Sequence, residues 1–214
     1  CYAKEDSSVI SGVSGYYYPL SKTFVGKGGK LFWTRAGLNS ATTYADILSV
    51  SVDLTSTEWG TDSAVFYSKQ YFKEPLRGKV LDKILANVSS EKATYPRFSS
   101  YDLNLGIKEI VKDADYVGGF SQHGSKMIGS GTKEQKASLT FKRDKKLFLV
   151  VSSMSFVVRP DRISSDNASF VCYHDQDSIY HPSVAMKYIS KDRELSFIRT
   201  SGVGVSMPFF NSFH

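Results

Sequence analysis

The strongest constraint on the fold is a regular alternation of apolar and polar residues between positions 137 and 200. In a strand every second side chain lies on the same face, so each apolar set marks one face. The breaks between runs are rich in turn-forming residues, as at 143–146, 160–166 and 190–193. Short strands separated by turns are typical of a β-sandwich or barrel. The apolar sets are Ala137/Leu139/Phe141, Met154/Phe156/Val158, Ala168/Phe170/Cys172, Val184/Met186/Tyr188 and Leu195/Phe197.

The first half of the chain continues the strand pattern with one interruption. Strands are predicted over 30–35, 47–54 and 64–67, the first of them entered through a tight turn at 26–29. That glycine cluster precedes a strand and lacks the Gly-Lys-Ser/Thr of a phosphate loop. The interruption is a helical spacing, which predicts one short amphipathic helix across an open end of the sandwich. The residues at that spacing are Val80, Leu81, Ile84, Leu85 and Val88.

Glycines punctuate the strands predicted at 116–120 and 124–131. Glycine within a strand often marks a bulge, a bend or a close backbone approach. Bent strands that join two sheets fit a jelly roll better than an up-and-down barrel. The predicted fold is therefore all-β: a two-sheet, jelly-roll-like β-sandwich with one short helix.

A chain of 214 residues fits one large all-β domain. Residues 1–15 are polar and small, which predicts a linker or extended lead-in, and residues 16–214 then form the single sandwich domain. Cys1 has two interpretations: the lipidated first residue of a mature lipoprotein, or a boundary within a longer chain. We favour the boundary, because the sequence also stops within an aromatic run at 207–214.

The net charge of +6 raises the question of a nucleic-acid partner. No zinc-finger spacing, recognition helix or aromatic RNA-binding signature accompanies the basic clusters, so we expect no nucleic acid. An anionic envelope polysaccharide would use the same charges. No run of 18 apolar residues is present, so no transmembrane segment is expected.

Four stretches resemble a β-sandwich region of large secreted or surface proteins of bacteria. They are residues 26–33, 116–131, 159–163 and 177–182. The resemblance covers most of the chain from about Tyr16 onward. It implies a module of an extracellular or cell-envelope protein that has neighbouring domains in the same chain as partners. It carries no catalytic residues over.

The densest group of metal-binding residue types is His174, Asp175 and Asp177, followed by His181. Asp-x-Asp supplies the oxygen ligands that calcium prefers, whereas imidazoles favour zinc or another transition metal. Asp-Gln-Asp is also ordinary hairpin-turn chemistry, and no complete metal motif is present. We favour the turn and keep calcium as the alternative.

Catalysis has no comparable motif. Gly202 to Ser206 does not match a nucleophile elbow, and the separation between two carboxylates cannot be read from sequence. Several carboxylates could be nominated, yet each is also explained as a strand-end or turn residue, and His123 as an ordinary polar histidine. A hydrolase with an unrecognised site remains an alternative function. The nominated carboxylates are Glu58, Asp62, Glu109, Asp113 and Asp115.

Aromatic residues in predicted loops point to ligand binding. Saccharides stack on exposed rings, and neighbouring polar groups fix their hydroxyls; loops on a rigid scaffold commonly carry such sites. The expected function is a non-catalytic, carbohydrate-binding module whose ligand is a glycan or anionic envelope polysaccharide. The alternative is a purely structural module that supports neighbouring domains. The candidate ligand-binding residues are Trp59, Tyr95, Arg97, Phe98 and Tyr101.

Overall fold

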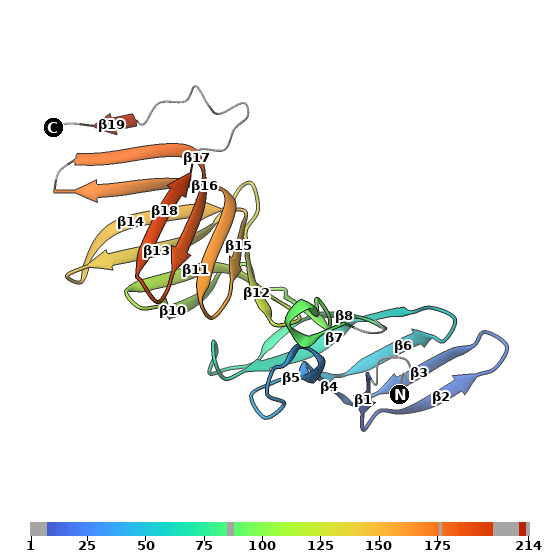
Figure 1. Cartoon of the computed structure of the whole chain (residues 1–214). Helices are drawn as coiled ribbons and strands as arrows, with labels where there is room; N and C mark the ends of the chain where they lie inside the picture. The colour runs from blue at the N-terminus through green and yellow to red at the C-terminus, as the bar shows by residue number, and fades with distance from the viewer. Residues whose placement is uncertain (1–7, 85–87, 176, 199–209, 213–214) are drawn as a thin grey trace. The chain divides into compact units, whose positions relative to one another are not determined.

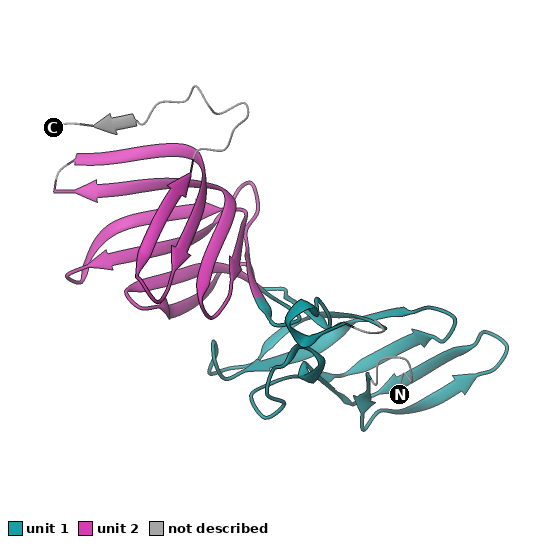
Figure 2. Cartoon of the chain, in the orientation of Figure 1, with its two compact units in different colours: residues 1–102, 121–126 teal, residues 103–120, 127–214 magenta. Residues whose placement is uncertain are grey.

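The computed structural model describes residues 8–84, 88–175, 177–198 and 210–212 (Figure 1). Contacts between residues divide the chain into two compact units (Figure 2). Unit 1 comprises residues 1–102 and 121–126, and unit 2 comprises 103–120 and 127–214. The sequence predicted one domain from residue 16. Strand β11 (Ala114–His123) contributes to both units, so no linker separates them in the sequence.

Unit 1 contains a main antiparallel sheet and a second sheet of three strands. The main sheet has the order β1-β4-β5-β7-β8-β9, and the end of β11 pairs with β9. Its strands are β1 (Ile10–Ser11), β4 (Lys30–Phe32), β5 (Thr43–Ile47), β7 (Glu58–Ser68), β8 (Leu76–Lys83) and β9 (Arg97–Ser100). The second sheet has the order β2-β3-β6, with β2 (Ser14–Tyr18), β3 (Thr23–Lys27) and β6 (Ser49–Asp53).

The strands near the N-terminus bear on two predictions. Residues 10–15 lie within β1 and β2 or between them, so part of the expected lead-in belongs to the two sheets of unit 1. The predicted turn before residue 30 is confirmed: Gly28 and Gly29 adopt positive φ angles of 71° and 116° between β3 and β4. Cys1 lies outside the described residues.

The predicted short helix at 80–88 is wrong for the residues that the structure describes, because residues 76–83 form strand β8; residues 85–87 of that range lie outside the described part of the chain. Val80 and Asp82 are buried on one face of β8, while Lys79 and Leu81 lie on the other. This period of two, with hydrogen-bonded strands on both sides, overrides the helical spacing. The helical turns among the described residues are the short 3-10 segments η1 (Thr34–Ala36) and η2 (Ser90–Lys92).

Unit 2 is also antiparallel. Most of its paired strands are neighbours along the chain, in the order β10-β11-β13-β14-β16-β17-β18. Strand β12 pairs with β15, and β15 pairs with β16. The all-β, sandwich-like fold with two antiparallel sheets is confirmed. Among the described strands most pairings are those of a meander. The strands besides β11 are β10 (Leu105–Val111), β12 (Lys126–Ser130), β13 (Ala137–Arg143), β14 (Lys146–Ser153), β15 (Ser155–Val158), β16 (Arg162–His174), β17 (Asp177–Ile189), β18 (Glu194–Ile198) and β19 (Phe210–Ser212), which pairs with β17.

The core of unit 2 follows the alternation that the sequence predicted. The sets in β13 and β17 are buried, as are Phe156 and Val158 in β15. Met154 is exposed because it lies in the turn between β14 and β15. Gly129 has a packing role: a Cβ atom there would come within 2.6 Å of the buried ring of Tyr116.

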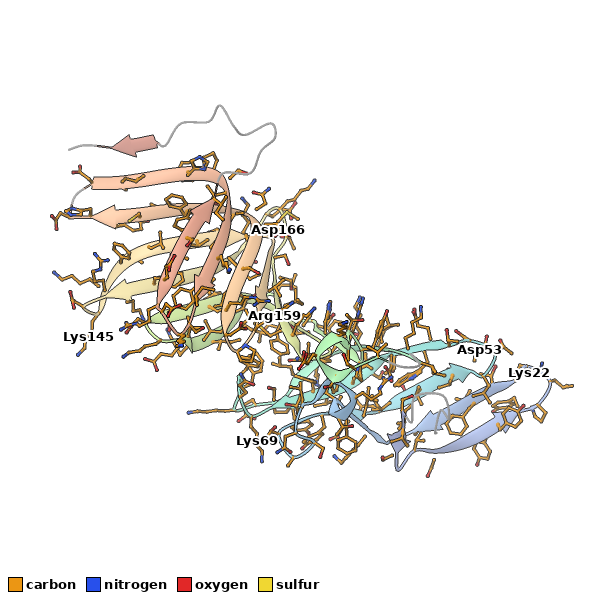
Figure 3. All side chains as sticks on the ribbon, viewed as in Figure 1. Lys22, Asp53, Lys69, Lys145, Arg159 and Asp166 are labelled. Carbon is orange, nitrogen blue, oxygen red and sulfur yellow. The ribbon has the colours of Figure 1, made fainter. Side chains whose placement is uncertain are left out.

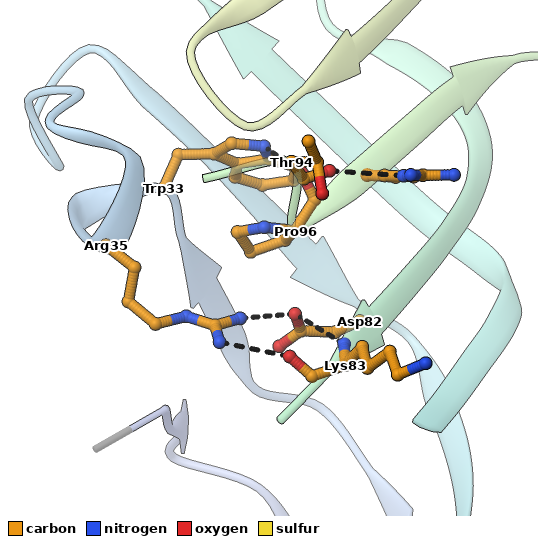
Figure 4. A network of polar contacts seen from close by, with 7 residues as sticks. Trp33, Arg35, Asp82, Lys83, Thr94 and Pro96 are labelled. Atoms are coloured by element: carbon orange, nitrogen blue, oxygen red, sulfur yellow. Dashed lines mark hydrogen bonds and ion pairs between the residues drawn. The ribbon is translucent and has the colours of Figure 1, made fainter. Parts of the chain in front are cut away.

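In unit 1 the aromatic core centres on Phe98, which is fully buried. Its ring stacks on Phe66 with 4.5 Å between ring centroids, and Trp33 meets Phe66 edge-on at 5.1 Å. The side chain of Asp82 is also buried, and Arg35 forms an ion pair with it (Figure 4). A buried carboxylate needs such a partner, because removing one member leaves an uncompensated charge.

Replacing Phe98 by alanine should destabilise the protein by about 3–5 kcal/mol, because a large aromatic side chain is removed from a packed core. Urea unfolding followed by tryptophan fluorescence measures the change, since Trp33 belongs to the same cluster. The control is Leu20→Ala, which alters a fully exposed side chain and should change stability by about 0.5 kcal/mol or less. Equal stabilities for the two variants would contradict the packing described here.

Unit 2 should lose stability in acid partly through Asp115. Hydrogen bonds from Lys142, the Glu109 amide and Lys108 lower the pKa of Asp115 from 3.8 to about 2. Because the folded-state pKa lies below the unfolded value, this stabilisation is complete above that value and is lost as the pH falls towards 2. Asp115→Asn should therefore destabilise the protein at neutral pH and progressively less below pH about 3.8. If the variant stays less stable than the wild type by the same free energy down to pH 2, the ionised Asp115 carboxylate is not the source of the stabilisation.

Candidate functional site

A hollow of about 370 Å³ lies on one face of the main sheet of unit 1. Its polar and charged lining residues are Thr61, Asp62, Lys79, Arg97, Ser99 and His123, and Leu81 adds an apolar patch. We call it the Arg97 pocket. It is formed by strands β7, β8, β9 and β11, and every residue that lines it belongs to unit 1.

Strand pairing brings these distant residues into cross-strand rows. Leu81 on β8 is paired with Arg97 on β9, and Arg97 is paired with His123 on β11. The next row on the same face contains Lys79, Ser99 and Ser121. Residues directly opposite each other in neighbouring strands share a face of the sheet. The pocket is therefore built on a rigid β surface.

Arg97 is held in place by its own chain segment. Its Nε donates a hydrogen bond to the Thr94 carbonyl at 3.1 Å, and its guanidinium carbon lies 4.3 Å from the centre of the Tyr95 ring. Trp33 supports the segment from the core side by donating from Nε1 to the Pro96 carbonyl at 2.8 Å (Figure 4). Among the described residues, the Nη groups of Arg97 have no hydrogen-bond partner. These two groups can contact a carboxylate or another anion in the paired geometry that guanidinium favours.

The charge of the pocket is mainly positive at neutral pH. Lys79 and Arg97 line it, against the single carboxylate of Asp62. Burial, together with the positive charges of Arg97 and Lys126, lowers the pKa of His123 to about 4. His123 is therefore a neutral imidazole at physiological pH, able to donate or accept a hydrogen bond. The pocket suits an anion that also carries hydroxyl groups.

Of the five predicted ligand-binding residues, Arg97 lines this pocket, and Tyr95 and Tyr101 contact residues that line it. Tyr95 covers one face of the Arg97 guanidinium. Tyr101 is 56% exposed, and its hydroxyl donates to the Asp62 carbonyl at 2.8 Å. These two contacts tie the aromatic residues to the positions that line the hollow.

The other two predicted residues point elsewhere. Phe98 belongs to β9, not to a loop, and alternation turns its side chain into the core, so it cannot stack on a ligand in this structure. Trp59 is half-buried on β7 and is paired with the buried Asp82. It therefore lies on the face of the sheet opposite Arg97.

The candidate metal residues are not brought together as a site. His174 and Asp177 end and begin the paired strands β16 and β17, and Asp175 lies in the hairpin turn with a φ of 53°. His181 is instead buried within β17, where its ring stacks on Phe170 at 6.2 Å. In the part of the chain that the structure describes, no three His, Cys, Asp or Glu side chains are grouped to hold a metal ion.

Sequence reasoning missed Lys79 and gave His123 no role in a site, and it treated Asp62 as a solvated carboxylate. Two signals bear on the site. Arg97, Ser99 and Tyr101 alternate along one face of β9 and just beyond it, which a strand assignment there would have shown. Lys79 could be assigned to the site only from the register between β8 and β9, which no local sequence pattern reveals.

No protein-family model, curated protein or solved structure matches this chain. Within the described ranges, no helix has the length and apolar character needed to cross a membrane. The candidate site therefore rests on its own geometry.

The neutral state of His123 can be tested by titration. Its imidazole resonances should stay constant from pH 8 to about 5 and shift around pH 4, because burial and the two neighbouring cations oppose protonation. Histidine NMR spectra of the wild type and of His123→Gln identify the resonances. A midpoint near the usual value of 6.5 would show that His123 is protonated far more readily than this environment allows.

Proposed function

We propose that this chain is a non-catalytic binding module for acidic polysaccharides, with the Arg97 pocket as the binding site. The observation that carries the proposal is the fixed guanidinium of Arg97, held at Nε and by the Tyr95 ring within a hollow that Lys79 also lines. Charge-assisted hydrogen bonds to a carboxylate are among the stronger polar contacts. Ser99 and neutral His123 supply partners for hydroxyl groups.

An extracellular or cell-envelope location is part of this proposal, because such polysaccharides occur there. A purely structural role would require no fixed cation in a hollow, so the pocket favours binding. A hydrolase acting on glycosidic bonds commonly uses two carboxylates. Asp62 is the only carboxylate in the described lining of the pocket, and we do not propose catalysis.

The first test is a binding screen of the purified chain against immobilised polysaccharides at physiological salt. The panel contains polygalacturonate, alginate and hyaluronan as acidic chains, and dextran and amylose as neutral ones. Binding to at least one acidic chain, weakening as salt is added, is the expected result, because salt screens charge attraction. Binding to none of the acidic chains would overturn the proposed function.

Arg97→Gln should weaken binding to the acidic chain by about tenfold or more, because a hydrogen bond to a charged group contributes about 1.5–3 kcal/mol. The matched control is Lys145→Gln, which removes one positive charge at the β13–β14 turn of unit 2 (Figure 3). Isothermal titration calorimetry measures both affinities. Equal losses in the two variants would mean that net charge, and not the pocket, determines binding.

A further inference from the structure

A second, larger hollow adjoins the Arg97 pocket within unit 1. Its volume is about 860 Å³, and it lies over the three-stranded sheet β2-β3-β6. Gly60, Thr61 and Asp62 of β7 line both hollows, so the two meet at this point. The register of β7 against β8 shifts between Thr61 and Ala64, which places a β-bulge at the junction.

The floor of the second hollow consists of small and hydroxyl-bearing residues. Ser14, Ser49, Ser51 and Thr61 line it, and the Thr61 hydroxyl donates to the Ser49 carbonyl at 2.6 Å. That bond links β7 to β6, and the amide of Leu48, just before β6, donates to the Ser63 carbonyl of β7 at 2.8 Å. The strands under the two hollows therefore follow one another as β11, β9, β8, β7, β6, β3 and β2.

Tyr16 provides an exposed aromatic ring in the second hollow. It is 78% exposed, and its cross-strand neighbour Val25 is also exposed. The next tyrosine, Tyr17, is 52% exposed and is paired with Phe24. Because side chains alternate along a strand, Tyr16 and Tyr17 lie on opposite faces of the sheet. Of these two residues, only Tyr16 lines the hollow.

Charged side chains occur at intervals along the joined hollows. Arg97 and Lys79 lie in the first hollow, Asp62 lies where the hollows meet, and Lys27 lies in the second. A chain with a carboxylate on every sugar would place one of them against Asp62. A chain with neutral sugars between its acidic ones would place hydroxyl groups there, and a carboxylate accepts hydrogen bonds from hydroxyls.

We infer that the two hollows form one extended groove for a linear polysaccharide whose acidic sugars alternate with neutral ones. An acidic sugar contacts Arg97 and Lys79, a neutral sugar contacts Asp62, and the chain continues onto the Tyr16 ring and Lys27. Seven neighbouring strands at about 4.8 Å spacing give the groove a length of roughly 30 Å, enough for several sugars. This inference rests on the proposed function, because it extends the ligand of the Arg97 pocket.

Hyaluronan oligosaccharides test the groove, because their acidic and neutral sugars alternate. Calorimetry compares a decasaccharide, which can follow the groove, with a tetrasaccharide, which is too short to reach both ends. The decasaccharide should bind at least about tenfold more tightly, because only it gains the stacking contact with Tyr16. Oligogalacturonate of the same length, with a carboxylate on every sugar, should bind more weakly than the hyaluronan decasaccharide.

Tyr16→Ala should remove most of the difference in affinity between the decasaccharide and the tetrasaccharide. Tyr17→Ala is the matched control, since it removes the same side chain from the opposite face of the same strand. This variant should still bind the decasaccharide more tightly than the tetrasaccharide. Asp62→Asn should narrow the difference between hyaluronan and oligogalacturonate. Circular dichroism and thermal unfolding of each variant verify that the fold is retained.

The possible results separate the two proposals. If the tetrasaccharide and decasaccharide bind equally, and both depend on Arg97, the extended groove is wrong and the Arg97 pocket stands. The groove is equally overturned if Tyr16→Ala and Tyr17→Ala behave alike, or if no hyaluronan oligosaccharide binds. Failure of every acidic polysaccharide in the screen described above overturns the proposed function itself.

Discussion

The stacking of Phe98 on Phe66 is the contact on which unit 1 and its candidate site depend. It fixes which residues of β9 face the core, and the pairing of β9 with β8 and β11 then fixes the opposite face. Arg97 and Ser99 reach the pocket because Phe98, between them, is buried. The same short strand therefore determines both how the unit packs and which side chains line the pocket.

The sequence predicted the all-β class because alternation is a local property. In β13 and β17, buried and less buried residues follow one another as the period of two requires. The helix at 80–88 was wrong because two periods compete there, and strand pairing on both sides of β8 decides between them. The division into two units was not predicted, since β11 contributes to both and leaves no compositional boundary.

The candidate site was predicted only where its residues are close in sequence. Arg97 and Tyr101 were candidates in one aromatic segment; Arg97 lines the pocket, and the Tyr101 hydroxyl donates to the backbone carbonyl of Asp62, one of its lining residues. Phe98 was misassigned because the segment was interpreted as a loop, in which neighbouring side chains can share a direction. Lys79 could not be predicted, because it reaches the pocket through strand register and not through any motif.

Strand β9 has a consequence for how this protein can change over evolutionary time. Inserting or deleting one residue just before Arg97 would exchange inside and outside along the strand, directing a guanidinium into the aromatic cluster and a phenyl ring into solvent. Substitutions at the outward positions leave the interior untouched. Single replacements can therefore change the chemistry of the pocket lining, whereas changes of length in this segment disrupt the pocket and the folding of the unit together.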